Sequence, residues 1–120
     1  MTTQTPARTV FLVEDEVMIR MMVADMLEEL GYTVAAEAGQ IDQALQLAQT
    51  TRFDFAILDV NVAGKLITPV ADLMMAKKRP FIFASGYGSP GLPPSYRSHP
   101  ALQKPFTTSS LSAMIDEILA

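Results

Sequence analysis

The chain alternates short apolar runs with longer segments in which apolar residues recur every three or four positions. The short runs contain few polar residues, which is typical of strands covered on both faces of a sheet. A charged residue or a glycine follows each run and indicates where it ends. The strands expected on this basis are residues 10–13, 33–36, 55–58 and 81–85, with a shorter fifth strand at 101–103.

The longer segments predict helices that each present one apolar face. Gly31 is a natural residue to follow the first of them, and Thr68 is expected to cap the third, with Pro69 at its first helical position. Glycines and prolines between residues 86 and 94 argue against a regular helix there. The expected helices are residues 17–30, 41–50, a third that ends at Pro80, and a last one from about Thr108.

The composition favours one domain and excludes several classes of protein. The chain has 120 residues, and no apolar stretch approaches the roughly 18 residues that span a membrane. Residues 1–9 lack the apolar centre of a signal peptide. We therefore expect a tail over 1–9, one domain over 10–120, no membrane partner and a cytoplasmic location.

Charge and cysteine content narrow the possible partners further. The net charge is −4, whereas a nucleic-acid surface needs clustered Lys and Arg. The one basic cluster, Lys77-Lys78-Arg79, suits the end of the third helix. The absence of cysteine excludes disulfides and thiolate metal sites. Nucleic acid is therefore not an expected partner.

Five polar side chains lie at or directly after the ends of predicted strands: Glu14, Asp15, Asp59, Ser85 and Lys104. Strands that alternate with helices predict a parallel sheet with helices on both faces, and ligands bind at the carboxyl ends of such strands. We therefore expect all five side chains to meet at one edge of the sheet.

Carboxylates brought together in this way repel one another unless a hard cation lies between them, and Mg²⁺ suits such a set of ligands. Asp59 is then the natural nucleophile for a phosphoryl group. Transfer of that group requires its oxygens to be neutralised by Mg²⁺, an ammonium group and a hydroxyl donor. Lys104 and Ser85 supply the last two.

Each of these residues also has a purely structural explanation. Acids after a first strand often only cap a helix, Ser85 before a glycine can serve a turn, and Lys104 before a proline can be a solvated charge. Their coincidence at one edge favours the functional interpretation. The eight methionines are interpreted as pliable filler rather than metal ligands, and His99 as a loop residue.

Residues 10–120 resemble the receiver domains of two-component response regulators. The matching motifs are Val-Phe-Leu-Val-Glu-Asp-Glu at 10–16, Leu58-Asp59-Val60, Phe83-Ala84-Ser85-Gly86 and Lys104-Pro105-Phe106. The resemblance implies a flavodoxin-like fold with five parallel strands in the order 2-1-3-4-5. It makes Asp59 the phosphoacceptor, and it implies a cis Lys104-Pro105 bond. The implied Mg²⁺ ligands are Glu14, Asp15, Asp59 and the backbone carbonyl of Asn61, with Ser85 and Lys104 binding the phosphate.

The sequence departs from the usual receiver pattern in three places. The interval from Asp59 to Ser85 is short, and the segment before Lys104 is rich in proline, so we expect a trimmed loop and a short or displaced fourth helix. Ala101 stands where most receivers carry a Tyr or Phe that swings inward on activation. The run from Phe83 to Tyr87 resembles the variant class called FAT GUY regulators, which makes Tyr87 a candidate switch residue.

The function implied by this resemblance is a stand-alone phosphorylation switch rather than a turnover enzyme. A histidine kinase or histidine phosphotransfer protein would donate the phosphoryl group, and altered binding of a downstream protein would be the output. One alternative is a pseudo-receiver that binds a partner without being phosphorylated. A flavin-binding electron carrier would need a phosphate-cradling loop where Glu14 and Asp15 stand, and a metal-dependent phosphatase would need a second carboxylate as general acid beside Asp59.

Overall fold

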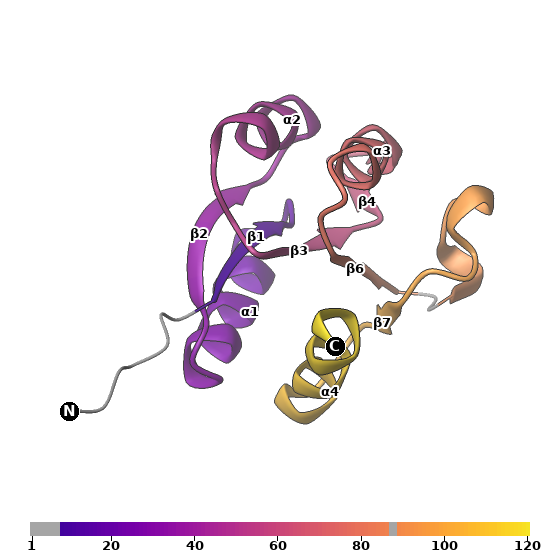
Figure 1. The fold of residues 1–120 in the computed structure, drawn as a ribbon. Helices are drawn as coiled ribbons and strands as arrows, with labels where there is room; N and C mark the ends of the chain where they lie inside the picture. Colours follow the sequence, from indigo (N-terminus) through magenta and orange to yellow (C-terminus); the bar gives the residue numbers. More distant parts are fainter. Residues whose placement is uncertain (1–7, 87–88) are drawn as a thin grey trace.

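A single parallel sheet forms the centre of the protein. The computed structural model describes residues 8–86 and 89–120 (Figure 1). The sheet has the order β2-β1-β3-β6-β7, which is the expected 2-1-3-4-5 order of its five strands along the chain. All four neighbouring pairs are parallel. The strands are β1 (Thr9–Val13), β2 (Thr33–Ala38), β3 (Phe55–Asp59), β6 (Phe81–Ser85) and β7 (Ala101–Gln103).

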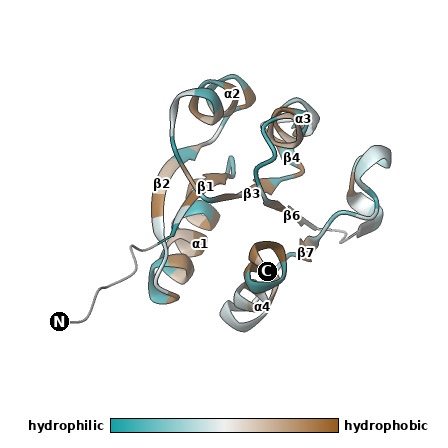
Figure 2. Cartoon of the chain, in the orientation of Figure 1, coloured by the Kyte–Doolittle hydropathy of each residue, from teal (hydrophilic) through white to brown (hydrophobic). Residues whose placement is uncertain are grey.

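Helices cover both faces of this sheet. In Figure 1, α1 and α4 lie on one side, and α2 and α3 on the other. Figure 2 shows that the strands are mainly hydrophobic, as expected for a sheet covered on both faces. The helices are α1 (Val17–Glu29), α2 (Ile41–Thr50), α3 (Thr68–Ala76) and α4 (Thr108–Leu119).

Two apolar clusters hold the layers together, one on each face of the sheet. The first contains Phe11 and Phe83 with the buried side chains of α2 and α3, and the second contains Leu12 and Ile82 with those of α1 and α4. Successive residues of a strand point to opposite faces, so β1 and β6 contribute to both clusters. This packing fixes the carboxyl ends of the strands, where the candidate site lies.

A small hairpin after β3 was not predicted. Its strands are β4 (Asn61–Val62) and β5 (Lys65–Leu66), joined by Ala63 and Gly64. Both turn residues have positive φ, 52° and 81°, which matches the two-residue turn whose twist suits a hairpin.

The third helix begins differently from the prediction. Ile67, not Thr68, is its N-cap residue, so Thr68 and Pro69 are its first two helical positions. The proposed Thr68 cap is therefore wrong by one residue. Pro69 remains compatible with the first turn, where a backbone N–H has no helical partner.

The expected absence of a regular fourth helix before β7 is confirmed for the described residues. Two 3₁₀ turns, Ser89–Gly91 and Pro94–Tyr96, occupy this part of the chain. The Lys104-Pro105 bond is cis, as the resemblance implies. None of the helices in 8–86 and 89–120 is long and apolar enough to cross a membrane. The cytoplasmic location stays a prediction.

Candidate functional site

Three carboxylates lie together where the carboxyl ends of β1 and β3 meet. Glu14 and Asp15 directly follow β1, and Asp59 is the last residue of β3. The parallel register places Val13 beside Leu58, so the residues that follow them emerge together. One oxygen of each carboxylate lies within 4.8 Å of the other two. Glu14 and Asp59 are buried, whereas Asp15 is partly exposed.

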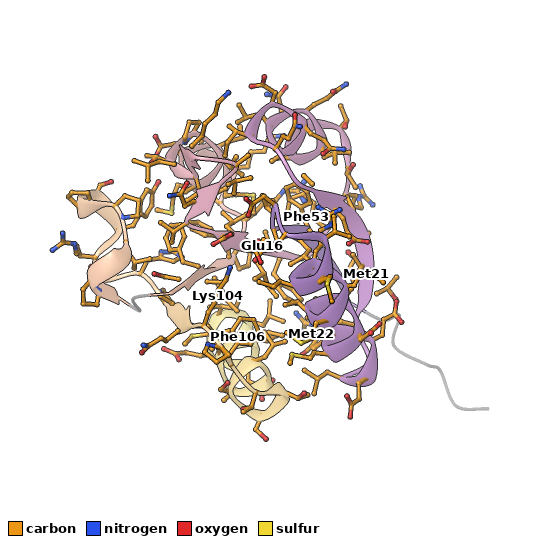
Figure 3. The ribbon with its side chains drawn as sticks, turned by 180° about the vertical axis from the view of Figure 1, so that it is seen from behind. Glu16, Met21, Met22, Phe53, Lys104 and Phe106 are labelled. Atoms are coloured by element: carbon orange, nitrogen blue, oxygen red, sulfur yellow. The ribbon has the colours of Figure 1, made fainter. Side chains whose placement is uncertain are left out.

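Lys104 reaches this cluster from the end of β7. Its Nζ lies 2.6 Å from Glu14 Oε1 and 3.2 Å from Asp59 Oδ1. Its backbone N–H donates to the Ser85 carbonyl, which fixes the residue beside β6. Figure 3 shows the end of the Lys104 side chain close to Glu16. One ammonium group therefore partly balances two buried carboxylates.

Backbone donors hold the acids at the β1–α1 connection. The N–H of Glu16 donates to Glu14 Oε2 over 3.1 Å, and the N–H of Ala63 donates to Asp15 Oδ2 over the same distance. Ala63 is the first turn residue of the β4–β5 hairpin. The unpredicted hairpin therefore supports the candidate site directly.

Burial dominates the protonation of Asp59. Loss of solvent is the main cause that raises the pKa of this carboxyl from 3.8 to about 7; the nearby charge of Glu14 adds to the rise, and Lys104 opposes it. Without a cation in the site, Asp59 therefore keeps its proton to much higher pH than an ordinary aspartate does.

Asp15 and Lys104 are held in their charged forms. Burial would raise the pKa of Asp15, but its hydrogen-bond contact with Glu14, the N–H that Ala63 donates and the charge of Lys104 lower it overall. Burial would lower the pKa of Lys104, but its contacts with Glu14 and Asp59 raise it overall. Lys104 is therefore a permanent cation, and Asp15 an acid that stays ionised.

A cleft of about 190 Å³ opens beside Asp59 and is lined also by Asn61, Ser85 and Gly91. Ser85 is buried at the end of β6, and Asn61 begins the hairpin. The structure therefore brings these two predicted residues next to the carboxylate that we identified as the nucleophile. The predicted switch residue Tyr87 lies outside the described residues.

The donor set fits a magnesium ion. Three carboxylates close enough to share one ion are hard oxygen ligands, and Mg²⁺ is usually held by one or two carboxylates together with water and phosphate oxygens. The same set would repel an anionic ligand that arrived without a cation. The cluster therefore has the chemistry to hold a divalent cation.

An aromatic cluster along β6 was missed by sequence reasoning. His99 stacks on Phe81 at 4.1 Å between ring centroids, and its Nε2 lies 2.9 Å from the Phe81 carbonyl oxygen. Tyr96 packs edge-on against Phe83 and donates a hydrogen bond to Asp72 of α3. His99 is a loop residue as predicted, but it has a packing role that spacing alone does not indicate.

Comparison with known proteins points in the same direction as the geometry. Residues 10–68 match the family model described as the response regulator receiver domain. The transcriptional regulatory protein PdtaR of Mycobacterium tuberculosis is 33% identical over 113 residues, which cover 91% of this chain. The match covers 55% of PdtaR, so the chain spans about half the length of that relative.

Solved structures match over nearly the full chain. The solution structure of SdrG from Sphingomonas melonis Fr1 is 35% identical with a TM-score of 0.86, and the match covers 98% of this chain and all of SdrG. The BeF3-activated conformation of SdrG from Pseudomonas melonis Fr1 is 36% identical with a TM-score of 0.81, covering 97% of this chain and all of that one.

Proposed function

This chain belongs to the family of response regulator receiver domains, and we propose that it is a phosphorylation switch whose Asp59 accepts a phosphoryl group from a phosphohistidine donor. The observation that carries the proposal is the meeting of Glu14, Asp15 and Asp59 within 4.8 Å, with Lys104 in contact with two of them. A packing role alone does not account for three acids at one buried point, because their mutual repulsion is costly.

The proposed reaction is a direct transfer. A carboxylate oxygen of Asp59 attacks phosphorus, the phosphorus–nitrogen bond of the donor breaks, and its electron pair returns to the imidazole. Because the pKa of Asp59 is about 7, loss of its proton is part of preparing the nucleophile. The Lys104 ammonium, 3.2 Å from Asp59 Oδ1, favours the ionised form and is placed to pair with phosphoryl oxygens.

The remaining residues complete this site. Mg²⁺ held by Glu14, Asp15, Asp59 and the Asn61 carbonyl would neutralise charge on the phosphoryl oxygens. The Ser85 hydroxyl would donate to one of those oxygens, since Ser85 lines the cleft beside Asp59. Slow hydrolysis would return the domain to its starting state, so we propose a switch rather than a turnover enzyme.

The donor would dock over α1, beside the site. Met18, Met21 and Met22 are more than half exposed on this helix. An apolar groove of about 280 Å³ is lined by residues of α1 together with Lys104 and Phe106. Figure 3 shows Lys104 and Phe106 beside Met22 of this helix. Exposed apolar side chains next to a groove are typical of protein contacts. We propose that a histidine kinase or a histidine phosphotransfer protein binds here.

The output would be a change in affinity for a downstream protein. The first alternative, a pseudo-receiver that binds its partner without phosphorylation, predicts no covalent modification. Phosphorylation with acetyl phosphate and Mg²⁺, followed by intact-protein mass spectrometry, separates the two. We expect one phosphate on the wild type and none on Asp59→Asn, which keeps the shape of the side chain and removes the nucleophile.

An unmodified wild type with both acetyl phosphate and a panel of phosphorylated histidine kinases would refute the proposal. Omission of Mg²⁺ is the matched control for the metal requirement. Equal labelling of Asp59→Asn would show that another residue accepts the phosphate. Asp54→Asn offers a further control, since Asp54 accepts hydrogen bonds from Thr9 at the opposite end of the sheet.

A further inference from the structure

The side chain of Arg20 turns back from α1 toward the connection that carries the two metal-site acids. Its Nη1 donates to the carbonyl oxygen of Glu14 over 2.8 Å, and its Nε lies 3.4 Å from Glu37 Oε1 at the end of β2. Within the part of the chain that the structure describes, Arg20 makes no hydrogen bond or ion pair with a carboxylate oxygen of Glu14, Asp15 or Asp59. Its contact with the site is therefore through the backbone.

Gly39 leaves the space that the guanidinium occupies. A Cβ atom at residue 39 would lie 2.8 Å from Arg20 Nη1 and 3.7 Å from the Glu14 carbonyl oxygen. The same connection is also held from β2, because the Glu14 N–H donates to the Ala38 carbonyl over 3.0 Å. The peptide groups on both sides of Glu14 are thus fixed, one by β2 and the other by Arg20.

We propose that Arg20 is a positioning residue for the Mg²⁺ site. The Glu14 carbonyl belongs to the peptide that joins Glu14 to Asp15, so a hydrogen bond to it fixes the direction in which both side chains leave the backbone. Outer contacts that orient metal ligands typically change metal affinity by 10- to 100-fold. The inference rests on the proposed function, because it assigns Arg20 to the cation site proposed there.

The charge of Arg20 and its hydrogen bond to the Glu14 carbonyl predict opposite changes in Mg²⁺ affinity when Arg20 is replaced. A guanidinium near the acids repels an incoming divalent cation, so its removal alone would tighten Mg²⁺ binding. Loss of the hydrogen bond to the Glu14 carbonyl would instead let the two acids spread and would weaken binding. The sign of the change therefore separates the two effects.

The experiment measures Mg²⁺ binding to the full chain by calorimetry at pH 8. We expect Arg20→Met to raise Kd about tenfold, and Arg20→Lys to raise it less, since an ammonium can still reach the carbonyl. Gly39→Ala should raise Kd in the same direction, because its Cβ displaces the guanidinium while the charge of Arg20 remains. Glu37→Gln is the matched control and should leave Kd within about twofold, since it removes only the 3.4 Å partner.

Thermal unfolding without Mg²⁺ shows whether each variant is folded. Unchanged or tighter binding in folded Arg20→Met would overturn the inference, as would equal weakening by Glu37→Gln. The phosphorylation rate at saturating Mg²⁺ should return close to the wild-type value in Arg20→Met, which a general loss of structure would not allow. If the wild type itself neither binds Mg²⁺ nor accepts phosphate, the proposed function fails. If the wild type does both and the Arg20 variants bind Mg²⁺ as tightly as it does, this inference alone fails.

Discussion

Replacement of Asp59 by Asn should stabilise the metal-free protein, and the gain should grow with pH. The pKa of Asp59 is about 7 in the folded chain and 3.8 for an ordinary aspartate, mainly because of burial. Between these values the folded protein binds a proton that the unfolded chain has released, so stability falls as pH rises. Asn carries no charge at any pH and is free of this cost.

The shift in the pKa of Asp59 gives an upper limit to the stability that Asp59→Asn can gain. Each pKa unit corresponds to about 1.4 kcal/mol, so the full cost above pH 7 is about 4 kcal/mol, of which about 2 kcal/mol develops between pH 5.5 and pH 8. The attraction of Lys104, 3.2 Å away, is already part of that pKa, but water that enters the cleft beside Asp59 lessens the cost of burying its charge. We expect about 1 kcal/mol between the two pH values, or about 4 °C in Tm for a chain of this length.

Thermal unfolding with a chelator present, at pH 5.5 and pH 8, measures this difference. The matched control is Asp116→Asn, a substitution of the same kind at an exposed position on α4, which should shift Tm equally at both pH values. Addition of Mg²⁺ at pH 8 should raise the Tm of the wild type more than that of Asp59→Asn. An Asn variant that is equally or less stabilised at pH 8 than at pH 5.5 would refute the reasoning.

Three further predictions concern the rest of the molecule. Asp15→Asn should weaken Mg²⁺ binding about tenfold by calorimetry, and it should slightly lower the metal-free Tm, because the lowered pKa of Asp15 means that the fold favours its charge. Tyr96→Phe should lower Tm by about 4 °C, because it removes the hydrogen bond to Asp72, about 1 kcal/mol, while the ring packing stays. Beryllofluoride, a phosphate mimic, should change amide exchange between Gly86 and Pro100, and Tyr87→Ala should remove these changes because Tyr87 is the candidate switch residue. Persistence of the changes in this variant would rule out Tyr87 as the switch residue.

The central sheet and the meeting of its end residues could be predicted because both depend on strong local patterns. The chain has continuous apolar runs at 55–58 and 81–84, and such runs form strands covered on both faces. Once the strands are parallel and in order, the residue after each run must lie at the same edge. The positions of Asp59 and Lys104 follow from topology without any knowledge of side-chain contacts.

The hairpin after β3 escaped prediction because its strands have two residues each and its turn lacks the usual signal. Asn-Gly and Asp-Gly mark such turns, whereas this turn is Ala63-Gly64 with Ala63 at φ 52°. Its backbone donor to Asp15 was therefore invisible in the sequence. Arg20 was missed for a related reason: its partner is a backbone carbonyl, and no pattern of side chains records that contact.

The aromatic cluster narrows where a phosphorylation signal could act. Ala101 pairs with Phe83 in the sheet and has no ring that could swing inward on activation. We expect the segment from Ser89 to Pro100, which joins the end of β6 to β7, to change conformation instead. Its second half is held at two points, by the hydrogen bond between Tyr96 and Asp72 and by His99 stacked on Phe81. Motion there would require several packed contacts to break together.

The first half of the segment, up to Leu92, lies beside the cleft next to Asp59. Gly91 lines the cleft beside Asp59, together with Ser85 and Gly86, so a phosphoryl group in that cleft would act on this turn first. A movement of Ser85 toward the phosphate pulls on the backbone before the turn, where Gly86 permits large dihedral changes. The changes in amide exchange caused by beryllofluoride should therefore be largest from Gly86 to Leu92 and small from Tyr96 to Pro100. If the hydrogen bond from Tyr96 to Asp72 is what holds the second half in place, amide exchange in both halves should change alike in Tyr96→Phe. Equal protection of both halves in the wild type would instead mean that the whole segment moves as one body.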